Sequence, residues 1–170
     1  RRAILGRWGK REMVIRSRLS CAMLMCLAAT SLAAQSPADK MFPQRAGCYI
    51  RQYSPDHLES HPAQRVTTIL LLAEASIAEP MLGVWVNVSL RGVPGGEFEA
   101  LSYCETVADT LSCGMEGDAG SFTLRPDKNG KVLLEVGRYG MSFENERGFE
   151  TLDRDRGDDR SFLLSPAVCR

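Results

Sequence analysis

The chain has 170 residues, of which 44% are hydrophobic, 25% charged and 7% aromatic. This composition is typical of one compact domain and excludes a collagen-like, low-complexity or largely disordered protein. The 21 Lys and Arg residues balance the 21 Asp and Glu residues, but basic residues are concentrated near the start of the chain.

Residues 1–34 have the pattern of a secretory leader. Arg16 and Arg18 precede a short apolar run, and the small residues up to Ala34 are typical of a signal-peptidase site. We expect Met13 as the start of the leader and cleavage near Ala34. The apolar run is too short and too diluted by polar residues for a stable membrane anchor. The sequence therefore predicts a periplasmic or secreted protein.

Removal of this leader changes the charge of the chain. It takes away seven of the 21 basic and one of the 21 acidic residues, which leaves 14 against 20 and a net charge of −6. Nucleic acid and anionic membrane surfaces are then poor partners, because binding to phosphate requires Lys and Arg. A cationic protein would be attracted to the mature chain. The alternative is that the net negative charge only keeps the protein soluble.

The folded part of the chain is expected to begin after a short lead. Residues 35–46 contain two prolines and little apolar periodicity, which predicts an extended lead to a single β domain over 47–170. The segment 48–53 has strand character. Ser54-Pro55-Asp56 then predicts the start of one short helix, which ends before Pro62.

Most of the remaining chain has the pattern of short strands. The clearest is 84–90, in which Val or Leu occupies every second position, as in a half-buried strand. The segment 66–75 has consecutive apolar residues in its second half and predicts a strand covered on both faces. A helix is the alternative there, but the β-branched residues weigh against it. Further strands are expected at 97–105, 110–116, 121–125, 131–136, 140–144 and 161–166.

The turn residues and strand spacing predict the fold class. Asn129-Gly130 lies between two expected strands and favours a tight hairpin turn, because both residues tolerate positive φ. We expect an all-β fold of about eight antiparallel strands with one short helix, either a small barrel or a sandwich. A barrel is the first choice, since closure removes edge strands.

Four cysteines follow the leader, namely Cys48, Cys104, Cys113 and Cys169. An even number in an exported chain predicts two disulfides, for which three connectivities exist. The short spacing of Cys104 and Cys113, and the positions of the other two near the ends of the domain, favour Cys104–Cys113 and Cys48–Cys169. The spacing matches no common zinc site, so metal ligation by these thiols is the weaker alternative.

The only two histidines, His57 and His61, are four residues apart on the predicted helix. Both imidazoles then lie on one helix face, as a zinc or copper site requires. However, Leu58 and Ser60 occupy the positions at which a zinc peptidase carries its catalytic Glu. We expect two solvent-facing histidines, with no metal and no cofactor.

Two acidic segments are candidate binding loops. The segment 153–160 resembles a calcium loop, but its Gly is one position early and Leu164 stands where a Glu is needed. A solvated, salt-bridged loop is therefore predicted. The segment 114–120 contains three glycines and follows an expected disulfide, which predicts a rigid bend. A plain hairpin turn is the favoured interpretation, and a loop that presents Glu116 and Asp118 to a cationic partner is the alternative.

Catalytic motifs are missing from the sequence. It contains no nucleophile elbow, Walker sequence or dinucleotide-binding glycine motif, and no residue is assigned a catalytic role. Glu97 and Glu99 lie on one strand face beside a Pro-Gly-Gly turn, where exposed charges are expected.

These features predict a function class. We expect an exported, non-catalytic binding or inhibitor module whose acidic loops engage a cationic protein, by analogy with periplasmic inhibitors of basic cell-wall hydrolases. A barrel that carries a small apolar ligand is the second hypothesis. A metal-dependent hydrolase that uses His57 and His61 is the third.

Overall fold

The structure is a computed structural model and describes residues 35–169. The predicted signal peptide and its cleavage site lie outside the described residues. None of the helices within 35–169 is both long enough and apolar enough to cross a bilayer.

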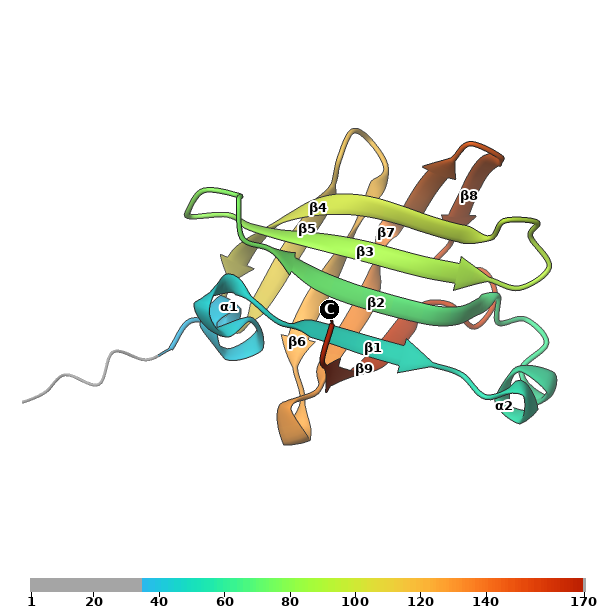
Figure 1. Ribbon diagram of the computed structural model, residues 1–170, viewed down its shortest axis with the longest axis horizontal. Helices are drawn as coiled ribbons and strands as arrows, with labels where there is room; N and C mark the ends of the chain where they lie inside the picture. Colours follow the sequence, from blue (N-terminus) through green and yellow to red (C-terminus); the bar gives the residue numbers. More distant parts are fainter. Residues whose placement is uncertain (1–34, 170) are drawn as a thin grey trace, which may run out of the picture. The chain divides into compact units, whose positions relative to one another are not determined.

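Nine strands form one antiparallel sheet that closes on itself (Figure 1). Neighbours in the order β6-β5-β4-β3-β2-β1-β9-β7 are hydrogen-bonded, and β6 also pairs with β7, so eight strands make a closed barrel. β8 adds to the free side of β7. The barrel predicted from the sequence is thus confirmed. The strands are β1 Cys48–Gln52, β2 Val66–Glu74, β3 Leu82–Leu90, β4 Glu97–Val107, β5 Thr110–Met115, β6 Gly120–Pro126, β7 Val132–Asn145, β8 Gly148–Leu152 and β9 Ser161–Ala167.

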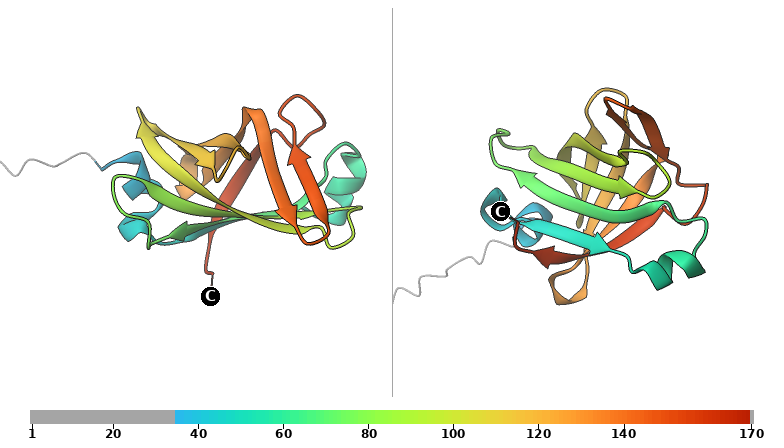
Figure 2. Two further views of the ribbon diagram at one scale, coloured as in Figure 1. Left: turned by 90° about the horizontal axis from the view of Figure 1, so that it is seen from above. Right: turned by 45° about the vertical axis from the view of Figure 1, so that its right-hand side comes forward.

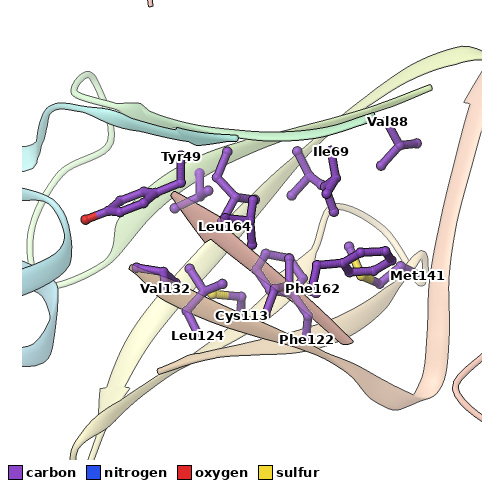
Figure 3. Packing of buried hydrophobic residues seen from close by; sticks show 14 of the residues in the cluster. Tyr49, Ile69, Val88, Cys113, Phe122, Leu124, Val132, Met141, Phe162 and Leu164 are labelled. Carbon is purple, nitrogen blue, oxygen red and sulfur yellow. The ribbon is translucent and has the colours of Figure 1, made fainter. Parts of the chain in front are cut away.

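Alternate side chains of every barrel strand fill the interior (Figure 3). On β3 the buried hydrophobic side chains are Leu82, Val84, Val86, Val88 and Leu90, as the period-two pattern predicts. Phenylalanines from four segments complete the packing and are each exposed by 1%: Phe42, Phe122, Phe143 and Phe162. The interior is therefore a packed core.

The β6–β7 hairpin confirms the predicted turn with one difference. Phe122 faces Val136 and Leu124 faces Leu134, so the expected apolar pairs are in register. Asn129 and Gly130 both have positive φ, at 60° and 70°. They belong to a short 3₁₀-helix, η2 (Lys128–Gly130), and the connection is therefore longer than a two-residue turn.

Two strands expected at 131–136 and 140–144 are one long strand, β7. The glycines between them do not make a turn but let β7 bend and approach β6. A Cβ atom at Gly120 would lie 2.1 Å from the carbonyl oxygen of Gly140, so no side chain fits there. The register of the β6–β7 pair shifts beside this contact. β8, which follows β7, was not predicted at all.

The segment 35–46 is not an extended lead. It contains helix α1 (Pro37–Met41) and a 3₁₀-helix, η1 (Pro43–Arg45). The Ser36 side chain accepts a hydrogen bond from the Asp39 N–H and so caps α1. Met41 and Phe42 then enter the core, where the Phe42 ring packs edge-on against Tyr49 with centroids 5.3 Å apart. The folded unit therefore begins before residue 47.

Helix α2 (Pro55–Ser60) confirms the predicted helix, with Ser54 as its N-cap and Pro55 at its first position. The segment 66–75 is a strand as expected, but it is not covered on both faces. Ile69 and Leu71 point into the core, whereas Leu72 is 37% exposed on the outside of the barrel. A second layer over this outer face is not formed by residues 35–169.

Both predicted disulfides are confirmed. Cys104 and Cys113 lie opposite each other in the β4–β5 hairpin, and both are buried. Cys48 opens β1 and bonds to Cys169, two residues beyond β9. Such bonds indicate folding in an oxidising compartment.

Removal of either disulfide should destabilise the barrel, and the long-range bridge should matter more. In the loop-entropy model a bridge across 121 residues contributes about 5 kcal/mol and one across nine residues about 3 kcal/mol. We expect Cys48→Ala/Cys169→Ala to lower the free energy of unfolding more than Cys104→Ala/Cys113→Ala, as measured by urea denaturation. The reverse order would contradict the loop-closure argument.

Candidate functional site

Apolar side chains line up across the outer face of β1–β4. Leu72 on β2 lies opposite Trp85 on β3, which in turn lies opposite Leu101 on β4. A parallel row begins with Ile50 on β1 and Leu70 on β2. These five residues are half-buried or exposed, so the sheet presents an uncovered apolar face.

A groove of about 580 Å³ lies beside these rows and is called the outer groove here. Its floor contains Ile50 and Leu70 on the outer sheet face. Four glutamates stand around it: Glu97 and Glu99 on β4, Glu144 on β7, and Glu146 just after β7. The full lining also includes Thr68, Asn87, Val88, Ser89, Phe98 and Asn145.

Hydrogen bonds hold the end of β7 against β4. The side-chain amide of Asn145 donates to the carbonyl oxygens of Gly95 and Glu97, at 3.0 Å each. Figure 2 shows the resulting contact, with the β7–β8 hairpin beside the β3–β4 turn. This contact brings Glu144 and Glu146 to the same groove as the two glutamates of β4, although they are more than 40 residues apart in the chain.

The loop that carries Glu116 and Asp118 continues this acidic edge. The Glu116 N–H donates to the Leu101 carbonyl oxygen at 2.9 Å, and the Ser142 N–H donates to the Ala119 carbonyl oxygen at 2.7 Å. The loop between β5 and β6 therefore bridges β4 and β7. Its two acidic side chains are exposed, as the sequence predicts.

Six exposed carboxylates thus flank the region where β4 and β7 meet, and they are called the acidic rim: Glu97, Glu99, Glu116, Asp118, Glu144 and Glu146. Among residues 35–169 the ion pairs are Arg45–Glu79, Arg65–Glu150 and Arg156–Asp153, so none involves the rim. Arg147, which packs against Gly95, is the nearby cation. The rim remains predominantly negative.

Trp85 is held on the outer face by Glu74. The indole Nε1–H donates to Glu74 Oε2 at 3.0 Å, and the Ser76 N–H donates to Oε1 at 2.9 Å. These hydrogen bonds, first the one from Ser76, lower the pKa of Glu74 to about 2. The carboxylate therefore stays ionised and keeps Trp85 oriented across the range of ordinary pH.

His57 lies in α2 and His61 is its C-cap residue, and their rings stack on each other. His61 is exposed as expected, whereas His57 is half-buried and not solvent-facing. Their ring centroids are 4.1 Å apart, and Tyr53 stacks on His57 at 4.7 Å. His57 Nε2 is 3.0 Å from Gln64 Oε1, and His61 Nδ1 is 2.9 Å from the His57 carbonyl oxygen. In the described part of the chain no group of three His, Cys, Asp or Glu side chains is placed to hold a metal ion.

The segment 153–160 is largely the solvated loop that the sequence predicts, with an ion pair of 3.6 Å between Arg156 and Asp153. Asp159 is the exception, because it is only 3% exposed. Its carboxylate accepts hydrogen bonds from the backbone N–H groups of Arg65, at 2.6 Å, and Val66, at 3.1 Å. Burial raises the pKa of Asp159, and these two donors oppose the shift. Its role is structural, as an anchor for the start of β2.

No family model, curated protein or solved structure matches this chain.

Replacement of Asp159 should destabilise the protein, because two backbone donors would lose their acceptor at a buried site. We expect Asp159→Ala to lower the free energy of unfolding by about 2 kcal/mol or more. Asp158→Ala is the matched control, since Asp158 is exposed, and it should change stability by less than about 0.5 kcal/mol. Equal effects in chemical denaturation would show that Asp159 is not an anchor.

Trp85 should report the protonation of Glu74, because it is the only tryptophan in residues 35–170. The folded-state pKa of about 2 lies below the ordinary value of 4.5. The stabilising hydrogen bonds are therefore complete above pH 4.5 and are lost as the pH falls towards 2. An NMR titration of the indole N–H should have its midpoint near the lower value and should disappear in Glu74→Gln. A midpoint near 4.5 would contradict this geometry.

Proposed function

We propose that this protein is an exported, non-catalytic binding module that captures a segment of a cationic protein in the outer groove. The two disulfides support an oxidising compartment, and the predicted leader supports a periplasmic or secreted location. The observation that carries the proposal is the combination of an apolar floor with a carboxylate rim in one groove.

Each part of the groove favours a particular part of the partner. Ile50 and Leu70 favour an apolar side chain, since burial of apolar area stabilises a complex by about 25 cal/mol per Å². The carboxylates around them favour flanking Lys or Arg side chains and raise the rate of encounter with a basic protein. The partner is therefore a basic protein with an apolar side chain between cationic ones, for which a basic cell-wall hydrolase is a suitable example.

The two alternative functions have less support in residues 35–169. A carrier of an apolar ligand needs a cavity inside the barrel, and phenylalanine, leucine and valine side chains occupy the interior instead (Figure 3). A metal-dependent hydrolase needs at least a third ligand beside His57 and His61, and the described residues place none there.

Binding of a purified basic cell-wall hydrolase should depend on salt and on the rim. In isothermal titration calorimetry we expect affinity to fall between about 50 mM and about 300 mM salt, because exposed charge pairs are screened. Glu97→Lys/Glu99→Lys should weaken binding by about tenfold or more, since like charges then face the partner. An acidic protein of similar size should not bind.

Three further variants distinguish the contribution of the apolar floor from that of the acidic rim. Leu70→Ser should weaken binding without changing its salt dependence, and Glu116→Lys should reduce affinity less than the β4 double variant. Asp127→Lys is the matched control, because Asp127 is exposed in the β6–β7 connection outside the rim. An affinity that does not depend on salt, or an equal loss of affinity in Asp127→Lys, would contradict the proposal.

A further inference from the structure

A second groove, of about 390 Å³, lies where β1 leaves β9 and is called the α2 groove. The two strands pair only as far as Ile50 and Ser165, and beyond that point α2 follows β1 away from the barrel (Figure 1). Arg51, Tyr53 and His57 line one side of the opening. Leu133, Leu163 and Arg160 line the other.

Arg51 is the distinctive residue of this groove. Its side chain is half-buried, and its Nε is the one buried side-chain nitrogen or oxygen of residues 35–169 that has no hydrogen-bond partner. The guanidinium carbon lies 4.6 Å from the centroid of the Tyr53 ring, and no carboxylate of the described residues forms an ion pair with it. A partly desolvated cation without a counter-ion favours an anion nearby.

The surrounding charges allow such an anion. Both oxygens of Asp159 are already bonded to backbone N–H groups of β2 and the residue before it. Asp158 lines the groove but is exposed, and Arg160 stands beside it as a second cation. The side chains around the groove are thus more positive than the chain as a whole, whose residues after 34 carry a net charge of −6 by sequence.

The walls of the groove specify the rest of the ligand. The rings of Tyr53, His57 and His61 stack in that order, so the groove meets the edges of the Tyr53 and His57 rings, and two leucines provide apolar contact on the opposite side. We propose that the α2 groove binds a small organic carboxylate with an apolar body, whose carboxylate is paired with Arg51. This site is separate from the outer groove and does not depend on the proposed protein partner.

The test uses benzoate as the probe and benzamide, its uncharged counterpart, as the comparison. In NMR titrations of the purified protein we expect benzoate to shift resonances of Tyr53, His57 and Leu163 in a saturable manner. Benzamide and inorganic phosphate should each bind about tenfold more weakly, because one lacks the charge and the other the apolar body.

Three variants identify the arginine that binds the carboxylate of benzoate. Arg51→Gln should reduce benzoate affinity by about tenfold, since hydrogen bonds to charged groups are the stronger ones. Arg160→Gln should reduce it by a smaller factor, because Arg160 is exposed whereas Arg51 is half-buried. Arg125→Gln is the control, because Arg125 is exposed near the end of β6, outside the groove. If Arg51→Gln does not fold, the comparison of benzoate with benzamide and the Arg160→Gln variant still test the proposed carboxylate site. No saturable shift, equal binding of benzamide, or equal binding of phosphate would overturn the proposal.

Discussion

The fold depends on the seam at which its first and last strands meet. β1 and β9 pair through only three residue pairs, from Cys48–Ala167 to Ile50–Ser165. The middle partner on β9 is Pro166, which has no backbone N–H to donate. Without this seam both strands would be open edges and the apolar interior would meet water. The bond from Cys48 to Cys169 lies at one end of the seam, so a covalent link reinforces the place where backbone pairing is shortest.

The short seam also determines what lies beside it. Because β1 separates from β9 after Ile50, the next side chains of β1 are not packed against a β9 neighbour. The Arg51 side chain therefore lies between the core and the α2 groove. Its positive charge is offset by the face of the Tyr53 ring. Asp159 holds the start of β2 in place from the loop before β9, so the walls of the opening are anchored on both sides. The early separation of β1 from β9 therefore has two consequences. The start of β2 needs Asp159 as an anchor, and the α2 groove is left open beside Arg51.

The sequence predicts those features that depend on neighbouring residues. Alternating apolar positions, Asn-Gly and the cysteine spacing led to the barrel, one hairpin and both disulfides. Helix α1 was missed although Ser36-Pro37 carries the same start signal as the helix that was predicted. The exposure of Leu72 has no local signal, because it depends on whether another layer covers the sheet. The approach of Glu144 to β4 depends on hydrogen bonds from Asn145 to a distant turn, and only the folded chain shows it.

The outer face of the barrel carries two features that do not stabilise the fold. Leucine and isoleucine on the outside of β1 and β2 leave apolar area in water. Carboxylates on β4 and at the end of β7 gather beside them without ion pairs among residues 35–169, and like charges brought together repel. Neither feature stabilises the barrel, whose core is complete without them. Sequences depart from local consistency mainly where a site is needed, so the coincidence of both departures in one groove favours binding as the purpose of this face.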